Sequence, residues 1–474
     1  MKNYLLLPLL SVLALASLSG CVSVGPDYEP PPPSVPDAWH TAVRQEIESK
    51  DPALQTWWTV FDDDILNGLI VRVSTNNLNL KTAIARIEQA AALRGVAASQ
   101  YWPDIVAGGS AQAIQNTRLN TPAGADRRDE LYRAGLSMAW ELDLWGRIRR
   151  SVESADASLQ AQVEDYRDIM VVLYSSVAAN YIQVRTLQKR IIMAKNNLKN
   201  QKETVKLTKN RFDAGLVPAL DVFQARLNQS RTESLIPPLR QHLTEAINRL
   251  SLLAGEMPYA LLQELEAPHP IPEAKKEIAF GVPAEILRQR PDIRRAERTL
   301  AAKNAQIGAT QAELYPTLAL PGSLAIEVLG SEGSLDSGNV TYGFGPQLRW
   351  NIFNGRRIRS QVDATKAETR AALHTYEQTV LQALEETENA MSAYKNESSR
   401  IQNLEVAAAS AQKSVELVTE LYKSGLTDFQ NVLNMERDLL TQEDDLAKSQ
   451  GQVSLDLVAI YKALGGGWSL PQAE

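Results

Sequence analysis

Residues 211–226 read RFDAGLVPALDVFQAR, and residues 421–437 read LYKSGLTDFQNVLNMER. Each stretch has an aromatic residue, Phe212 or Tyr422, three positions before a glycine, and a leucine directly after that glycine. Glycine suits the left-handed position that ends a helix, and Pro218 suits the first turn of the helix that follows. Each stretch therefore predicts a tight corner between two antiparallel helices.

The two corners belong to a longer internal repeat. An offset of 210 residues relates Gly215-Leu216 to Gly425-Leu426, and the same offset relates Trp140 to Trp350. Two tandem copies are predicted, over 62–256 and 283–468. The remaining segments are 1–20, 21–60, a linker over 257–282 and a tail over 469–474.

Each copy is predicted as a helical run, two strands, a very long helix and a second helix. The expected strands cover about 102–115 and 131–143 in the first copy, and about 315–329 and 341–353 in the second. The expected helices after them cover 147–214 and 218–254, and then 356–424 and 428–464, with Thr427 or Asp428 as the last N-cap. The first helical runs cover about 64–100 and 283–314.

The long helices give the clearest signal. No Gly or Pro occurs between Arg147 and Ala214, or between Arg356 and Ser424. From Tyr376 to Tyr422, mostly apolar residues recur at alternating steps of four and three, which predicts coiled-coil packing. At 1.5 Å per residue such a helix spans roughly 100 Å, which favours a role in crossing a gap.

The predicted strands alternate between apolar and polar residues. In the first copy Tyr132, Ala134, Leu136, Met138, Trp140 and Leu142 share one face, while Arg133, Gly135, Ser137, Ala139 and Glu141 share the other. Segments of about ten residues with apolar-out, polar-in alternation and aromatic ends are typical of outer-membrane barrels. A half-buried soluble sheet shows the same alternation. The predicted membrane aromatic belt consists of Trp102, Tyr132, Trp140, Tyr315, Tyr342 and Trp350.

Four strands per chain cannot close a membrane barrel, because an open edge in lipid leaves backbone groups unpaired. The chain must therefore oligomerise. Two chains would supply eight strands around a filled interior, whereas three would supply twelve and leave a lumen.

The amino terminus, MKNYLLLPLLSVLALASLSGC, has the apolar core of a signal peptide over 1–20. Leu18-Ser19-Gly20-Cys21 resembles a bacterial lipobox, which implies acylation of Cys21 and anchoring in lipid. An ordinary signal peptide is the alternative. The Pro-rich segment 25–36 is predicted to be an extended spacer between the anchor and the folded body.

Composition argues against several functions. The net charge is −7, and no basic block interleaved with aromatics indicates nucleic-acid binding. The four histidines are scattered without metal-ligand spacing, and no catalytic or cofactor motif is complete. We therefore expect neither an enzyme nor a metal or cofactor site.

Several long stretches resemble the outer-membrane factor (TolC-like) family, in its lipoprotein branch from multidrug efflux systems. They include WWTVFDDDILNGLIVRVSTNNLNL (57–80), AWELDLWGRIRRSVESADA (139–157), RQRPDIRRAERTLAAKNAQIGATQAELYP (288–316) and YKALGGGW (461–468). The resemblance implies a mainly α, α+β chain that forms a trimer. Its twelve-strand outer-membrane β-barrel would continue into a periplasmic α-helical barrel.

The resemblance also implies partners. These are a periplasmic adaptor protein and an inner-membrane pump, most often of the RND type, which the channel serves from the outer membrane. The adaptor would dock on the two corners, at Gly215, Leu216, Val217, Gly425, Leu426 and Thr427. Six quasi-equivalent docking positions in a trimer would explain the repeat.

The family also closes its periplasmic end with a ring of side chains just after the second corner. The matching positions are Gln430, Asn434 and Arg437, of which only Arg437 keeps the family's residue type. Asp221 and Asp428 could supply the missing charge. The expected function is a passive exit duct for drugs or other small toxic compounds. The alternatives are a type I protein-secretion channel and a non-conducting lipoprotein scaffold that spans the periplasm.

Overall fold

The computed structural model describes residues 23–32, 35–36, 39–40, 54–115, 117, 128–274, 289–330 and 337–468. The chain divides into two compact units. The first comprises Met1–Pro32, Arg86–Val163 and Arg295–Glu377, and the second comprises Pro33–Ala85, Glu164–Arg294 and Gln378–Glu474.

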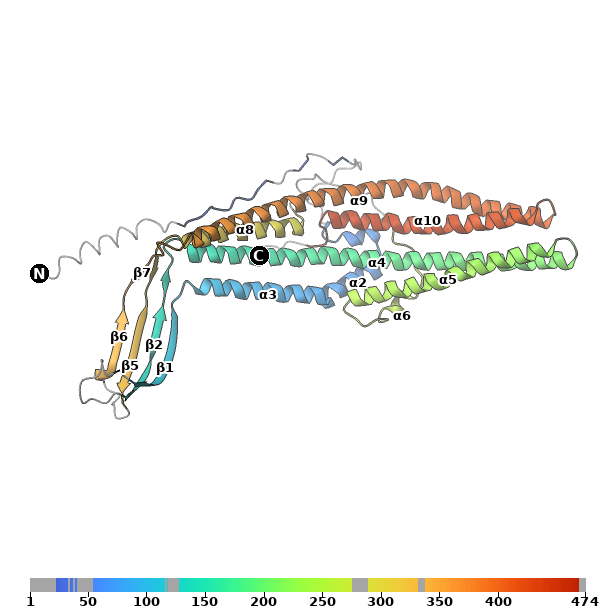
Figure 1. Ribbon diagram of the computed structural model, residues 1–474. Coiled ribbons are helices and arrows are strands. Elements are labelled where there is room, and N and C mark those ends of the chain that lie inside the picture. Colours follow the sequence, from blue (N-terminus) through green and yellow to red (C-terminus); the bar gives the residue numbers. More distant parts are fainter. Residues whose placement is uncertain are drawn as a thin grey trace. The chain divides into compact units, whose positions relative to one another are not determined.

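The first unit contains an antiparallel sheet in the order β1-β2-β5-β6 (Figure 1). Its strands are β1 (Asp104–Gln115), β2 (Arg128–Ala139), β5 (Gly322–Leu329) and β6 (Val340–Phe344). The pairing of β2 with β5 joins the two copies of the repeat. Within the described residues, β1 and β6 are the edges of this sheet.

A second, smaller sheet contains β3 (Glu141–Leu142), β4 (Thr317–Ala319) and β7 (Gln347–Arg349). Three of the expected strands are therefore each divided in two: 131–143 breaks at Trp140, 315–329 at Leu320-Pro321, and 341–353 at Gly345-Pro346. Proline has no N–H to donate to a ladder, which accounts for the last two breaks.

The helices follow the repeat (Figure 1). They are η2 (Trp57–Phe61), α2 (Asp64–Asn76), α3 (Leu78–Ser99), α4 (Arg147–Asp213), α5 (Ala219–Leu253), α6 (Leu262–Leu265), α8 (Pro291–Ala312), η3 (Ser337–Asn339), α9 (Arg357–Lys423) and α10 (Phe429–Ala463). The heptad positions from Tyr376 to Tyr422 are all buried or half-buried, including the polar Thr387 and Glu397. Part of the expected run 283–314 lies outside the described residues.

The expected helical run over 64–100 is interrupted at Asn77. Its side-chain oxygen accepts hydrogen bonds from the backbone N–H groups of Asn79 (2.8 Å) and Leu80 (3.1 Å), so Asn77 caps α3. Its amide nitrogen donates to the carbonyl of Leu253 at 2.7 Å. A periodicity count misses this break because the apolar spacing continues through it.

The main core of the second unit is formed around α2, the middle of α4 and the end of α5. Trp57 is fully buried and stacks on Tyr461 with ring centroids 5.3 Å apart. Tyr181 donates to the carboxylate of Asp63 (2.8 Å), and Asp63 in turn accepts from the N–H of Leu66 to cap α2. Trp57, which the sequence placed in the amino-terminal segment 21–60, thus belongs to the folded body.

Residues 23–32 pack against helices of the first unit. The Tyr28 hydroxyl donates to Glu297 (2.6 Å), and Arg150 donates to Asp27 (2.6 Å). Gly25 lies against Gly308, where a Cβ on Gly25 would approach the backbone to 2.4 Å. The segment expected to be an extended spacer is therefore held against the folded body at these residues. Cys21 lies outside the described residues.

Among the described residues, no helix has both the length and the apolar character needed to span a membrane.

Candidate functional site: the paired helical corners

The two corners have the same backbone. Gly215 and Gly425 both have φ of +74°, the left-handed region in which glycine avoids the penalty of a Cβ. In the first corner the N–H of Gly215 donates to the carbonyl of Phe212 (2.8 Å), and that of Leu216 to Arg211 (2.9 Å). The second corner repeats both bonds at 3.0 and 2.9 Å. This pair of bonds is the Schellman arrangement, which satisfies carbonyls at a helix end.

The residues after the glycines differ in exposure. Leu216 and Leu426 are 67% and 74% exposed at the two tips. Val217 is half-buried and packs on an apolar cluster formed by Ala225, Tyr422, Phe429, Val432 and Leu433. This cluster combines side chains of both corners, so the two corners pack side by side (Figure 1).

The helices after the corners begin differently. Asp428 is the N-cap of α10, and its carboxylate accepts from the N–H of Asn431 at 3.0 Å. Asn431 also donates from its side chain to the Thr427 hydroxyl (2.9 Å). Pro218 occupies the N-cap position of α5 itself, one residue before the expected first turn, and supplies no side-chain bond.

Arg211 links the two corners. Its Nη1 donates to the carbonyls of Tyr422 and Lys423 at the end of α9, both at 2.8 Å. Its guanidinium also lies over the Tyr422 ring, 4.8 Å from the centroid. A cation at a helix C-terminus is favourable because it faces the negative end of the helix dipole. Sequence reasoning missed this residue, although a basic residue in the last turn before a glycine is a recognisable signal.

Asp221 and Tyr422 lie next to this contact. Burial and the nearby charge of Asp428 raise the pKa of Asp221. Burial, and next the charge of Asp221, raise the pKa of Tyr422 to about 12. The buried Tyr422 hydroxyl lies near the Asp221 carboxylate but has no hydrogen bond of ordinary geometry within the described part of the chain.

A second polar cluster lies one to two helical turns further from the tip. Glu436 is 5% exposed and accepts from the Thr204 hydroxyl (2.7 Å) and the Asn228 amide (2.9 Å). Arg437 donates to the Asn228 oxygen at 3.4 Å. Burial raises the pKa of Glu436, and the two hydrogen bonds partly oppose that rise. The cluster joins α4, α5 and α10.

The sequence missed Glu436 as well. A signal for it does exist, because Phe429, Val432, Leu433 and Leu439 form an apolar stripe on α10 and Glu436 falls on that stripe. The five residues expected to form the gate lie in separate places within one chain. Asp221 and Asp428 interact through charge, Gln430 donates to Asn434 (2.9 Å), and Arg437 joins the Glu436 cluster.

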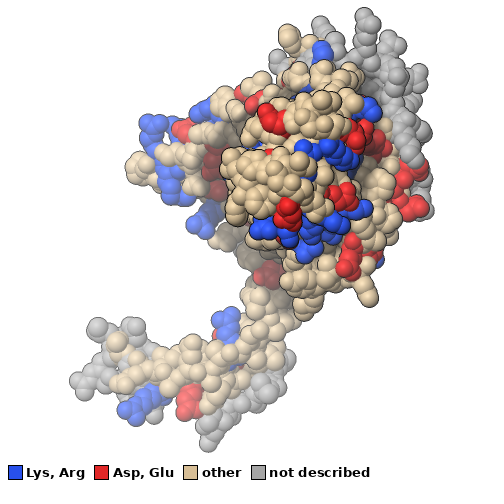
Figure 2. Space-filling view, turned by 90° about the vertical axis from the view of Figure 1, so that its right-hand side faces the viewer, with Lys and Arg blue, Asp and Glu red and all other residues tan. Residues whose placement is uncertain are grey.

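Figure 2 looks onto the corner end of the molecule, where the foremost surface is largely uncharged and Lys and Arg side chains gather beside it. The first hairpin contributes a stripe of exposed lysines on α4. These are Lys195, Lys199, Lys202, Lys206 and Lys209. An exposed basic stripe next to apolar tips is a surface suited to a partner that carries acidic groups.

The sheet carries the aromatic residues expected at the membrane interfaces. The indole N–H of Trp140 donates to the carbonyl of Tyr101 (3.0 Å), and that of Trp350 donates to the carbonyl of Leu314 (3.1 Å). The two tryptophans are repeat equivalents, and both bond to the last residues before the first strand of their copy. The matching tryptophans of the two copies thus make the same kind of hydrogen bond.

The other aromatics lie at different points. Tyr132 and Tyr342 project from β2 and β6 and are 43% and 84% exposed. Trp102 is exposed just before β1, and Tyr315 stacks on Trp145 with centroids 4.8 Å apart. Tyr132 and Trp140 are eight residues apart, or about 27 Å along an extended strand.

The comparisons with known proteins agree with this architecture. A sequence model described as outer membrane efflux protein matches residues 69–256 and 282–466, which are the two copies of the repeat. The chain belongs to the outer membrane efflux protein family.

Two curated relatives match this chain over nearly its whole length. Nodulation protein T of Rhizobium leguminosarum bv. trifolii is 30% identical over 460 residues, covering 95% of this chain and 96% of the relative. The pyoverdine export outer membrane protein OpmQ of Pseudomonas aeruginosa is 30% identical, covering 97% and 98%.

A solved structure of the outer-membrane channel OprN is 36% identical and superposes with a TM-score of 0.87, covering 94% of this chain and 99% of that one. The protein is accordingly an outer-membrane channel of an efflux system, with a mainly helical α+β fold in two halves. Membership of this family of channels means that the chain is not an enzyme.

Proposed function

We propose that three copies of the chain assemble into an exit duct that carries small toxic compounds outward from an inner-membrane pump. The duct has a twelve-strand barrel in the outer membrane, and its helices continue into the periplasm. An acyl group on Cys21 anchors the chain in lipid. The observation that carries the proposal is the pair of identical corners with exposed leucines, joined by Arg211.

The sheet supports the trimer. In the part of the chain that the structure describes, strands β1 and β6 are the edges of a four-stranded sheet, and such edges cannot persist in lipid. Twelve strands leave a lumen, whereas eight leave an interior just wide enough for side chains. The outer face of this sheet is apolar, with Leu136, Leu324 and Tyr342 exposed, as a lipid-facing surface requires.

The belt residues support the same orientation. Trp140 and Trp350 would lie at the periplasmic interface, with Trp102 and Tyr315 near them. Tyr132 and Tyr342 would lie at the outer one. Along a strand tilted by about 35–45°, the stretch from Tyr132 to Trp140 spans roughly 20 Å of height, most of an apolar band about 25 Å tall.

The corners are the proposed adaptor-docking surface. Gly215, Leu216 and Val217 form one docking tip, and Gly425, Leu426 and Thr427 form the other. A partner with apolar side chains at its own tip and acidic residues beside it would match the exposed leucines and the lysine stripe. A periplasmic adaptor that serves an RND-type pump is the partner we expect.

The gate is proposed at the same end. Asp221, Asp428, Gln430, Asn434 and Arg437 would close the duct where three chains meet. Because Gln430 and Asn434 are amides, hydrogen bonds rather than ion pairs would act at these two positions of the second hairpins. Their part of the gate would depend more weakly on pH and cations than a carboxylate ring, while Asp221 and Asp428 supply charge.

The assembly is tested by a cysteine pair across neighbouring edges, with Ala107→Cys in β1 and Tyr342→Cys in β6, two positions that the pairing register places on the same face of the sheet. A covalent trimer after mild oxidation is the expected result. A product no larger than a dimer would contradict the twelve-strand barrel.

Docking is tested with photo-crosslinkers at Leu216 and Leu426 in living cells. Leu252, which is 60% exposed near the other end of α5, is the matched control position. Capture of one periplasmic adaptor at both tips and not at Leu252 is expected. Equal capture at all three positions would contradict the docking role, and capture of an ABC exporter with a protein substrate would indicate secretion instead.

A further inference from the structure

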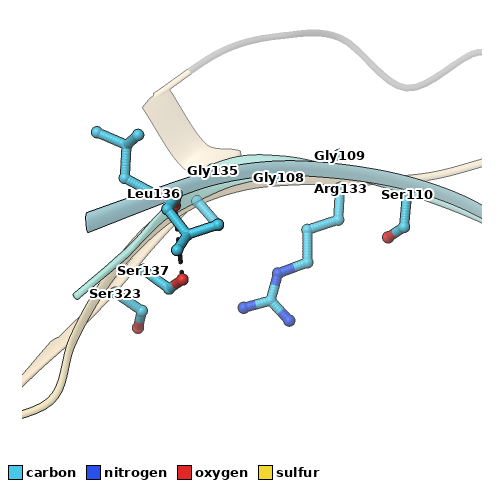
Figure 3. A pocket seen from close by; sticks show the side chains of 10 residues that line it. Gly108, Gly109, Ser110, Arg133, Gly135, Leu136, Ser137 and Ser323 are labelled. Atoms are coloured by element: carbon cyan, nitrogen blue, oxygen red, sulfur yellow. Dashed lines mark hydrogen bonds between the residues drawn. The ribbon is translucent and has the colours of Figure 1, made fainter. Parts of the chain in front are cut away.

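The concave face of the four-stranded sheet holds a hollow of about 410 Å³. It is lined largely by small residues, namely Gly108, Gly109, Ser110, Gly135, Ser137, Ser323 and Ala325, together with Val106, Leu136 and Arg133. Arg133 is the one charged residue among those that line it. Figure 3 shows Arg133, Ser110, Ser137 and Ser323 on one side of the ribbon, with Leu136 on the other.

The pairing register fixes which residues share this face. Ser110 is opposite Arg133 on the β1 side, and Glu327 is opposite Arg133 on the β5 side. Directly opposed residues project to the same face of a sheet. The Arg133 Nε lies 3.2 Å from the Glu327 carboxylate, and both side chains remain partly exposed.

On one side of this pair the residues are too small to cover it. Next along the strands come Gly108, Gly135 and Ala325, opposed in register. A Cβ on Gly135 would lie 2.5 Å from the Leu324 carbonyl and 2.6 Å from the Cβ of Ala325, so no larger residue fits there without a shift. The Arg133–Glu327 pair therefore borders small residues on one side, while Gln112, Leu131 and Leu329 flank it on the other.

We propose that Arg133 and Glu327 form a ring of ion pairs whose cancelling charges keep the barrel lumen open to solutes of either charge. This inference rests on the proposed trimeric barrel, in which the concave face lines the lumen and the pair occurs three times. Rings of charged side chains decide which ions enter a pore. The native ring is neutral in sum, so it passes solutes of either charge.

The neutral ring predicts a specific asymmetry. Removing the carboxylate leaves three arginines without compensation, which favours anions. Removing the guanidinium leaves three carboxylates, which favours cations. Loss of both returns the ring to neutrality.

The test uses Ser110→Cys as a reporter next to Arg133, in the full-length protein in intact cells. Its modification rate is compared for an anionic and a cationic methanethiosulfonate reagent added from outside. The chain without the added cysteine is the blank for Cys21. A unit charge within roughly 5 to 10 Å of the thiol in water changes the ratio of the two rates by about fivefold.

Glu327→Gln is expected to shift the ratio about fivefold toward the anionic reagent, and Arg133→Gln about fivefold toward the cationic one. The double variant should return to the native ratio, and Arg133→Lys should keep it. Glu130→Gln is the matched control. Glu130 lies on β2, as Arg133 does, but projects to the opposite face of the sheet, where its carboxylate accepts a hydrogen bond from the Tyr132 hydroxyl.

The outcomes separate this inference from the proposed function. If the reporter is labelled normally but neither charge change alters the ratio of the two modification rates, the proposed ring of ion pairs is overturned. The barrel itself would stand. A reporter that neither reagent reaches from outside would contradict the barrel lumen itself. For each variant, a trimer band on an unboiled gel confirms that the protein has assembled.

Discussion

The first and second corners share a backbone and differ in almost everything that follows it. Both glycines have φ of +74° and both corners close with the same two hydrogen bonds. After the first corner, Leu220 and Phe223 are 61% and 65% exposed. At the equivalent positions of the second, Gln430 is exposed and Leu433 is buried.

This difference shows that the conformation of the turn and the burial of the residues after it have separate causes. Glycine and the helix-end hydrogen bonds are local, so duplication preserved them. Burial depends on the neighbouring hairpin, which is different for each copy. The second hairpin has an acidic residue, Glu436, inside a shared polar cluster, where the first has the exposed Arg226.

The largest effect is expected from Glu436→Ala. It leaves the Thr204 hydroxyl and the Asn228 amide buried without their partner and opens a cavity, which should cost about 3 kcal/mol of unfolding free energy. The thermal midpoint of the detergent-solubilised assembly measures it. Arg226→Ala, at the equivalent position of the first copy, should change the free energy by at most about 0.5 kcal/mol. Equal effects would show that burial does not distinguish the copies.

Arg211→Ala comes next. It removes two charge-assisted bonds to the end of α9 and the contact with the Tyr422 ring, at a cost of about 2 kcal/mol. Hydrogen exchange of backbone amides over 420–428 should accelerate, because the last turn of α9 loses its cap. The control is Leu421→Ala, because Leu421 is the repeat equivalent of Arg211 and is 45% exposed. It should leave the exchange over 420–428 nearly unchanged. Unaltered protection in Arg211→Ala would mean that the link does not hold the corners together.

The glycines test the shared part of the comparison. Gly215→Ala and Gly425→Ala each place a Cβ in the left-handed region, at a cost of about 1 to 2 kcal/mol. No atom lies within 4 Å of the new Cβ at Gly215, and only the Arg211 side chain lies at 3.9 Å at Gly425. The two variants should therefore lower the thermal midpoint equally. A clear inequality would show that the second corner is strained by its neighbours.

The smallest expected effect concerns pH. The pKa of Asp221 is raised in the folded chain, so its protonated form is favoured by folding. Its contribution to stability is therefore fully present below the ordinary pKa near 3.8 and is lost as pH rises through the folded value. Asp221→Asn should raise the thermal midpoint slightly at pH 7 and have no effect near pH 3.

Position 431, the repeat equivalent of Asp221, is already an asparagine. Glu436→Gln separates the contribution of Glu436, another carboxyl near this end of the molecule whose pKa burial raises. If the difference in thermal midpoint between the native protein and Asp221→Asn stays constant from pH 3 to pH 7, burial of Asp221 does not affect the stability of the corner.

Several features of the fold could be read from the sequence because their causes are local. The expected helix over 147–214 and α4 differ by one residue, and so do 356–424 and α9 at each end. Uninterrupted heptad spacing and a terminal glycine decide such boundaries. The expected strands are less accurate, since β2 begins at Arg128 rather than 131 and three strands break.

The candidate site was predicted less completely. The corners were found because glycine marks them, whereas Arg211 and Glu436 were missed. Their partners lie more than 200 residues away, at Tyr422 and Thr204, so nothing near them in the chain reports the contact. The contact of the amino-terminal segment with the folded body was not predicted for the same reason, since Tyr28 bonds to Glu297, far away in the chain.

The sequence by itself therefore determined the repeat, the long helices, the two corners and the alternating strands. Each of these depends on backbone geometry and on the spacing of apolar residues over a few turns. Only the tertiary structure decided which corner residues are buried, that Arg211 caps the other hairpin, and that Arg133 faces Glu327 across two copies of the repeat. Those facts depend on how distant segments pack, because a charged side chain acquires its partner only when the two segments are brought together.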